Sequence, residues 1–163
     1  MKVLALRHIG IIVDNLDLMI QFYIGLGFQS RSRELEANSF VRDLTKLDLL
    51  GFETTKMYLD QKSRDNLEVN LPFVLELLKP IYYNENSHIQ KIVGGGTHLN
   101  FGMHDISLTV DDIEHVLEYV RLNNGCILSG PLKPVSQYAF PSLHSYCLDP
   151  EGNILHIAQN LSR

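Results

Sequence analysis

The chain has 163 residues, of which 45% are apolar and 20% are charged, a composition typical of globular proteins. A chain of this length buries roughly 70% of the surface that it would expose when unfolded, so its core can be stable without disulfide bonds. The apolar fraction excludes a disordered chain, and the absence of a glycine period excludes a collagen-like one. A net charge of −5 without a basic cluster argues against nucleic acid as a partner.

The two cysteines indicate a reducing compartment. Cys126 and Cys147 are neither closely spaced nor part of a metal-binding motif, so we expect two buried thiols rather than a disulfide or a zinc site. No stretch reaches the roughly 18 uninterrupted apolar residues of a membrane span. The sequence therefore predicts a cytoplasmic protein that does not associate with membranes.

The chain contains an internal repeat. A segment that begins at His8 resembles one that begins at Asp105, and aligning Val13 with Val110 places an aspartate directly after each valine. In both copies an amphipathic stretch follows. We expect each copy to consist of a strand, a turn capped by aspartate and a helix.

The apolar spacing predicts the same order of elements in both halves. Helical periodicity covers residues 16–26 and 113–122. Strand-like stretches follow at 28–36, 52–59 and 73–79 after the first helix, and at 126–128, 144–148 and 154–159 after the second. Both halves are therefore predicted to be βαβββ modules, spanning 1–80 and 101–163, with a hinge at 81–100. We expect the segments Asp60–Asn70 and Pro131–Pro141 to be loops that wall a cleft.

Four blocks in this order resemble a known family. They are HIGIIVD at 8–14, LELLKP at 75–80, VDDI at 110–113 and DPEGNILH at 149–156. The chain resembles the vicinal oxygen chelate superfamily, which includes glyoxalase I, methylmalonyl-CoA epimerase, extradiol dioxygenases and antibiotic-resistance proteins. The resemblance implies an α+β fold in which residues 1–163 form a single domain. Its two pseudosymmetric βαβββ modules would form a cleft-lined, partly open, barrel-like sheet.

The resemblance also implies a divalent metal ion held near the start and the end of each module. The matching positions are His8 and Glu76 in the first module, and Asp105 and His156 in the second. The usual family pattern has histidine at the third position and glutamate at the fourth, so both depart from it here. The exchange keeps two imidazoles and two carboxylates, a set that suits zinc, nickel, iron, cobalt or manganese.

Strand alternation bears on the third ligand. Asp105, Ser107 and Thr109 alternate with apolar residues that should face the helix, so Asp105 is expected on the cleft side. His104 has the other parity and points away unless a bulge shifts the strand, which leaves it as the alternative ligand. Glu76 lies within an apolar run and therefore needs a cation or a hydrogen-bonding site if it is buried.

The leading functional prediction is a metal-dependent lyase or isomerase acting on a small oxygen-rich molecule. The ion would stabilise an enediolate or oxyanion while a cleft residue moves the proton of an adjacent C–H group. In relatives a glutamate near the metal, often the one at the fourth ligand position, moves this proton. In this chain the catalytic candidates are Glu76 and His156, and Glu53 is a second candidate base.

Two other functions remain open. One is a metal-free protein that sequesters a small molecule such as an antibiotic in the cleft. The other is a ring-cleaving dioxygenase, with iron held by His8, His156 and one of the two carboxylates. The substrate-binding wall is assigned to four aromatic residues, Phe40, Tyr58, Tyr138 and Phe140. By analogy with relatives and with the commonest assembly of soluble proteins, we expect a homodimer.

Overall fold

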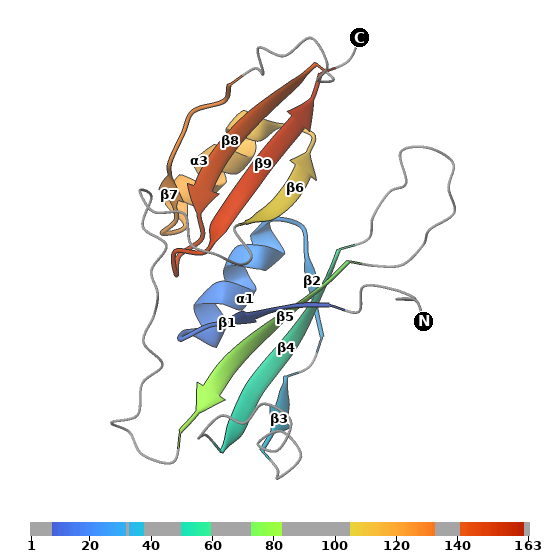
Figure 1. The fold of residues 1–163 in the computed structure, drawn as a ribbon, viewed down its shortest axis with the longest axis vertical. Coiled ribbons are helices and arrows are strands. Elements are labelled where there is room, and N and C mark those ends of the chain that lie inside the picture. The colour runs from blue at the N-terminus through green and yellow to red at the C-terminus, as the bar shows by residue number, and fades with distance from the viewer. Residues whose placement is uncertain are drawn as a thin grey trace, which may run out of the picture. The chain divides into compact units, whose positions relative to one another are not determined.

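The computed structural model describes residues 8–31, 33–37, 50–59, 73–82, 105–132 and 141–161. They belong to two compact units, Met1–Gln90 and Lys91–Arg163, and Figure 1 shows the elements of each. The expected loop at Asp60–Asn70 and most of the expected hinge and of the segment Pro131–Pro141 lie outside the described residues. Within the described part of the chain, no helix is long and apolar enough to cross a membrane.

The first unit contains one helix and one mixed sheet. Its elements are β1 (Ile9–Ile12), α1 (Leu16–Gly25), β2 (Gln29–Ser30), β3 (Glu34–Glu36), β4 (Gly51–Leu59) and β5 (Phe73–Ile81). The strand order is β1-β5-β4-β2, and the short strand β3 also pairs with β4. Strand β1 runs parallel to β5, whereas the other pairs are antiparallel.

The second unit repeats this topology. Its elements are β6 (Ile106–Val110), α3 (Ile113–Leu122), β7 (Cys126–Ile127), β8 (Ser142–Leu148) and β9 (Ile154–Asn160). The strand order is β6-β9-β8-β7, and β6 is parallel to β9. The predicted α+β class with two βαβββ modules is therefore confirmed, and both sheets are open.

In the first unit, strand alternation separates a core face from a polar face of the sheet. Helix α1 packs against β4 and β5. Its buried residues meet the side chains of alternate strand positions, which are also buried because apolar surface gains free energy on leaving water. The buried apolar residues of this core are Ile11, Val13, Leu16, Met19, Ile20, Phe22, Tyr23, Phe28, Met57, Leu75 and Leu77.

The second unit has the same arrangement. Helix α3 packs against β7, β8 and β9. The buried apolar residues of this core are Ile106, Ile113, Leu117, Val120, Cys147, Leu155 and Ile157. In both sheets the residues between these core positions lie on the opposite face, where the polar side chains of the predicted site are found.

Both helices begin where the apolar spacing predicts, at Leu16 and Ile113, and the capping residue of each follows the aligned aspartate by one position. The Asn15 side chain accepts a hydrogen bond from the Leu18 amide (3.1 Å), and the Asp112 side chain accepts one from the His115 amide (3.0 Å). The expected aspartate cap is therefore wrong for the first helix, where asparagine caps instead. Asparagine serves equally well because its side-chain oxygen satisfies the same unpaired amides of the first turn.

The two helices also end alike. Gly27 follows α1 with a φ of 95°, and Asn124 follows α3 with a φ of 65°. These residues occupy corresponding places in the aligned repeats, and both adopt the left-handed conformation that ends many helices. Asparagine is one of the few residues other than glycine that tolerates this conformation.

The cysteines differ in exposure. Cys147 is buried, as expected, but Cys126 is exposed, so the prediction of two buried thiols is wrong for Cys126. Cys126 pairs with Leu148 in register, whereas Cys147 pairs with Ile127. Alternation therefore places the two thiols on opposite faces of the sheet. Burial, with smaller contributions from Asp149 and Cys126, raises the pKa of the Cys147 thiol to about 12.

Candidate functional site

The first sheet carries a buried carboxylate between two nitrogen groups. Glu76 on β5 pairs with Gly10 of β1 on one side and with Lys56 of β4 on the other. Its Oε2 atom is 3.2 Å from Nε2 of His8, and its Oε1 atom is 3.4 Å from Nζ of Lys56. The side chain of Glu76 is 9% exposed, compared with 37% for His8 and 35% for Lys56. We call His8, Lys56 and Glu76 the glutamate cluster.

The glutamate cluster satisfies the requirement deduced from the sequence. A carboxylate with this little exposure would destabilise the fold by several kcal/mol if it had no partner. His8 and Lys56 both meet it from the more exposed side. Lys56 was not predicted, because the contact depends on the pairing register of β4 and β5. Alternation within β4 puts Lys56 on the face opposite the buried Met57, but the residue that it meets across the strands is not encoded there.

The second sheet carries two histidines in direct contact. Nδ1 of His144 on β8 is 2.9 Å from Nε2 of His156 on β9. The ring centroids are 5.1 Å apart and the ring planes differ by 25°. Nδ1 of His144 and Nε2 of His156 therefore face each other between the two ring centres. The outer nitrogens contact serine hydroxyls: His144 Nε2 is 2.8 Å from Ser142 Oγ, and His156 Nδ1 is 3.1 Å from Ser107 Oγ.

Tyr146 and Asp105 complete this face. The ring of Tyr146 stacks on that of His156, with centroids 4.8 Å apart and planes within 20°. The Tyr146 hydroxyl donates a hydrogen bond to the Asp105 carboxylate. Burial first, and then the contact with Asp105, raise the pKa of Tyr146. We call Asp105, Ser107, Ser142, His144, Tyr146 and His156 the histidine cluster.

The pKa of His156 is lowered in this environment. Burial is the largest cause, since it disfavours the charged imidazolium. The neighbouring His144 lowers the pKa further, whereas the negative charge of Asp105 acts in the opposite direction. The net lowering of the pKa favours the neutral imidazole of His156, which is the form that binds metal ions.

The strand registers align the two clusters position by position. Gly10 lies opposite Glu76, and Ser107 lies opposite His156, in two parallel strand pairs. His8 and Asp105 each precede these strand positions by two residues. The registers therefore agree with the alignment of His8 with Asp105 that the repeat predicted, and with the correspondence of Glu76 and His156 that the family resemblance implied. His104, the alternative third ligand, lies outside the described residues.

Of the four aromatic residues predicted to bind substrate, Tyr58 belongs to the part of the chain that the structure describes. Tyr58 lies on β4 two residues after Lys56 and thus on the same face of the sheet. The guanidinium of Arg31 lies over its ring, 4.6 Å from the centroid. Phe40, Tyr138 and Phe140 lie outside the described residues.

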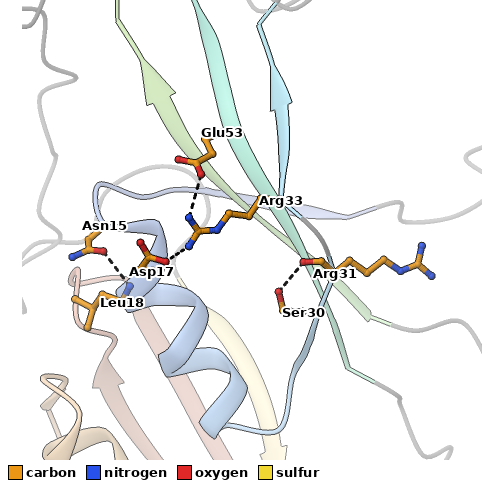
Figure 2. A network of polar contacts seen from close by, with 7 residues as sticks. All are labelled: Asn15, Asp17, Leu18, Ser30, Arg31, Arg33 and Glu53. Atoms are coloured by element: carbon orange, nitrogen blue, oxygen red, sulfur yellow. Dashed lines mark hydrogen bonds and ion pairs between the residues drawn. The ribbon is translucent and has the colours of Figure 1, made fainter.

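Glu53 lies on the opposite face of the first sheet from Glu76. Alternation along β4 places Glu53 with Met57, whereas Lys56 faces the carboxylate. Figure 2 shows Arg33 between Glu53 and Asp17, with the Glu53 contact at 3.2 Å. The prediction that Glu53 serves as a second base beside Glu76 is therefore wrong. Its carboxylate instead links β4 through Arg33 to the first turn of α1.

The donor atoms fit a metal ion in pairs rather than in larger groups. Two neighbouring ligands with bonds of about 2.1 Å lie about 3.0 Å apart at a right angle and about 3.4 Å apart at the tetrahedral angle. The His8–Glu76 separation lies within this range, and the His144–His156 separation lies close to its lower end. Among the described residues, no group of three or more histidine, cysteine, aspartate or glutamate side chains has metal-binding geometry.

Comparisons with known proteins identify the family. Residues 5–157 match the model of the glyoxalase/bleomycin resistance protein/dioxygenase superfamily, so the chain belongs to this superfamily. A search of curated proteins gave no match.

Solved structures support the same fold. A glyoxalase family protein from Bacillus cereus is 18% identical, with a TM-score of 0.71, over 99% of this chain and 97% of that one. A glyoxylase/bleomycin resistance protein/dioxygenase domain from Frankia sp. EAN1pec is 12% identical, with a TM-score of 0.60, over 99% and 95% of the two chains. At these identities the similarity establishes the fold and leaves the reaction to be argued from the side chains.

Proposed function

We propose that the protein is a metal-dependent lyase or isomerase acting on a small oxygen-rich molecule. The main support is the His8–Glu76 contact, in which an imidazole nitrogen and a carboxylate oxygen, 3.2 Å apart, lie at the ligand separation of one divalent ion. The corresponding positions in the second sheet carry Asp105 and His156, which are also metal-binding residue types.

In this proposal the candidate ligands are His8 and Glu76 on the first sheet and Asp105 and His156 on the second, and a bound ion would supply Lewis-acid stabilisation of a substrate oxyanion. Zinc, nickel, iron, cobalt and manganese all accept such a set of imidazoles and carboxylates. A proton from the carbon next to the substrate carbonyl would pass to Glu76 or to His156, whichever of the two side chains is released from the ion. The lowered pKa of His156 supports this role, because a neutral imidazole accepts a proton without first losing one.

The decisive experiment is metal analysis of the full chain purified without chelator, followed by calorimetric titration with Zn²⁺, Ni²⁺, Co²⁺ and Mn²⁺. We expect one ion per chain, and weaker binding in Glu76→Gln because the variant loses a charged ligand. Lys79→Gln is the matched surface control, since residue 79 has the opposite parity to residue 76 on the same strand. Failure of the wild-type chain to bind any of these ions would contradict the proposal.

A second candidate is a metal-free protein that binds a small molecule. The Lys56–Glu76 ion pair favours it, because the ammonium already neutralises the buried carboxylate without a metal. In that case the charge of Lys56, the imidazole of His8 and the ring of Tyr58 would contact the bound molecule. Wild-type protein that stays metal-free after incubation with all four ions would favour this candidate.

A further inference from the structure

His144 lies in contact with the nitrogen of His156 that the proposed function uses. It is positioned two residues before Tyr146 on β8, and alternation brings both side chains to the same face. Its Nδ1 atom, 2.9 Å from Nε2 of His156, occupies the place of a hydrogen-bond partner or of a second ligand to a shared ion. Any ion bound by Nε2 of His156 must therefore displace His144 or bind it as well.

The outer nitrogens of the pair are held in a way that suits metal binding. Ser142 and Ser107 contact one outer nitrogen each, at 2.8 and 3.1 Å. A hydroxyl can accept a hydrogen bond from a ring N–H, and when both outer nitrogens carry the proton, both inner nitrogens present lone pairs to one another. In that tautomer a cation bound between the inner nitrogens relieves the repulsion of their lone pairs, whereas in the other tautomers an N–H of one ring donates a hydrogen bond to the other ring. Metal-binding histidines commonly have their other ring nitrogen fixed by such a hydrogen bond.

Asp105 is engaged differently. Its carboxylate accepts the hydrogen bond of the Tyr146 hydroxyl, and the Tyr146 ring stacks on His156. This hydrogen bond occupies part of the acceptor capacity of the Asp105 carboxylate. Among the interactions of the described residues, Nδ1 of His144 contacts only Nε2 of His156.

We propose that His144 is a metal ligand, and that the second unit binds a divalent transition-metal ion through Nδ1 of His144 and Nε2 of His156. This inference rests on the proposed function and changes its ligand set: Asp105 stays with Tyr146, and a second imidazole takes its place. A pair of imidazoles favours Zn²⁺, Ni²⁺ and Co²⁺ over Mn²⁺, because imidazole suits the former ions and oxygen ligands suit the latter.

The test compares metal binding by the full-length variants His144→Ala, His144→Asn and Asp105→Asn, with His115→Ala as a control on the exposed surface of α3. Zn²⁺ affinity is measured by competition with a chromophoric chelator. We expect both His144 variants to lose at least about tenfold in affinity, because removal of even a hydrogen-bonding partner of a metal ligand typically costs about 10- to 100-fold. Asp105→Asn and His115→Ala should stay within about threefold of the wild type, a difference of about 0.7 kcal/mol.

A second measurement uses the wild-type chain and so does not depend on the folding of any variant. Imidazole ¹⁵N NMR spectra recorded during Zn²⁺ addition should show Nδ1 of His144 and Nε2 of His156 shifting together as metal-bound nitrogens. A shift at His156 alone, or a larger loss from Asp105→Asn than from His144→Ala, would overturn the His144 assignment while leaving the proposed function intact. Absence of any Zn²⁺ binding would overturn both.

Discussion

Lys56 lies directly across from Glu76 on the neighbouring strand, and its ammonium nitrogen is 3.4 Å from the carboxylate. The same position in the second sheet is occupied by Tyr146, which lies across from His156. One sheet thus carries a positive charge where the other carries a neutral ring. This difference determines how easily an external cation can compete for the residue opposite.

Removal of the Lys56 charge should strengthen metal binding. In Lys56→Met the ammonium no longer competes for Glu76, and its repulsion of a divalent ion is lost. Because Lys56 is partly exposed, we expect a gain of about 1 kcal/mol, or about fivefold in affinity. Calorimetric titration with Zn²⁺ measures the change. Lys79→Met removes the same charge on the other face and should have a smaller effect; equal gains in both variants would indicate a general charge effect.

Cys147 should contribute to the loss of stability at alkaline pH. The pKa of its thiol is about 12 in the folded protein, well above that of an unfolded thiol at about 8.5. Between these two values the unfolded chain binds fewer protons than the folded one, so the free energy of unfolding falls as pH rises. Urea unfolding at pH 8 and pH 10 should show a smaller decrease for Cys147→Ala than for the wild type. An unchanged pH dependence would contradict this prediction.

The exposed thiol should react first. Cys126 is exposed, whereas burial of Cys147 both blocks access of an alkylating reagent and raises the pKa of its thiol. Iodoacetamide at pH 8 should modify Cys126 in the folded chain, and both cysteines only after denaturation. Peptide mass spectrometry identifies the modified residue. Comparable labelling of both residues in the folded chain would be inconsistent with the burial of Cys147.

Asn124 should be sensitive to substitution by residues with a β-carbon. Its φ of 65° costs an ordinary side chain about 1 kcal/mol, whereas glycine adopts it without strain. We expect Asn124→Ala to lower the free energy of unfolding by about this amount, and Asn124→Gly to leave it nearly unchanged. Chemical denaturation with circular dichroism measures both. A more stable alanine variant would show that the left-handed conformation is not maintained in solution.

Asp149 holds the turn between β8 and β9. Its Oδ1 atom accepts hydrogen bonds from the amides of Glu151 (3.0 Å) and Asn153 (2.9 Å), and Oδ2 accepts one from the Asn153 side chain (2.7 Å). Asp149→Ala leaves these partly buried donors unpaired and should cost about 3 kcal/mol. Asp149→Asn can keep the two amide bonds and should cost less. Equal losses would show that the negative charge, rather than the oxygen acceptor, is what stabilises the turn.

The repeat made the fold predictable from the sequence. Aligning Val13 with Val110 predicted both helices, and the same alignment agrees with the pairing of Gly10 with Glu76 and of Ser107 with His156. These features follow from local periodicity, which a sequence displays directly.

The contacts between strands were less predictable. Lys56 and His144 were missed as members of the two clusters, because their partners depend on how β4 pairs with β5 and how β8 pairs with β9. A usable signal existed for His144: the predicted strand 144–148 places it on the same face as Tyr146. The hydrogen bond of Asp105 with Tyr146 required the register, which hydrophobic spacing alone does not specify.

Because the two sheets pair in the same register, each position on one sheet has an equivalent position on the other, where the same side chain can be introduced. Glu76 and His156 occupy one backbone position in two copies, and so do Lys56 and Tyr146. After duplication of an ancestral module, each copy could therefore change its chemistry at these positions while the backbone pairing stayed the same. An engineer can use the same correspondence to graft the histidine pair onto the first sheet, with Thr54 and Glu76 as the two positions to replace.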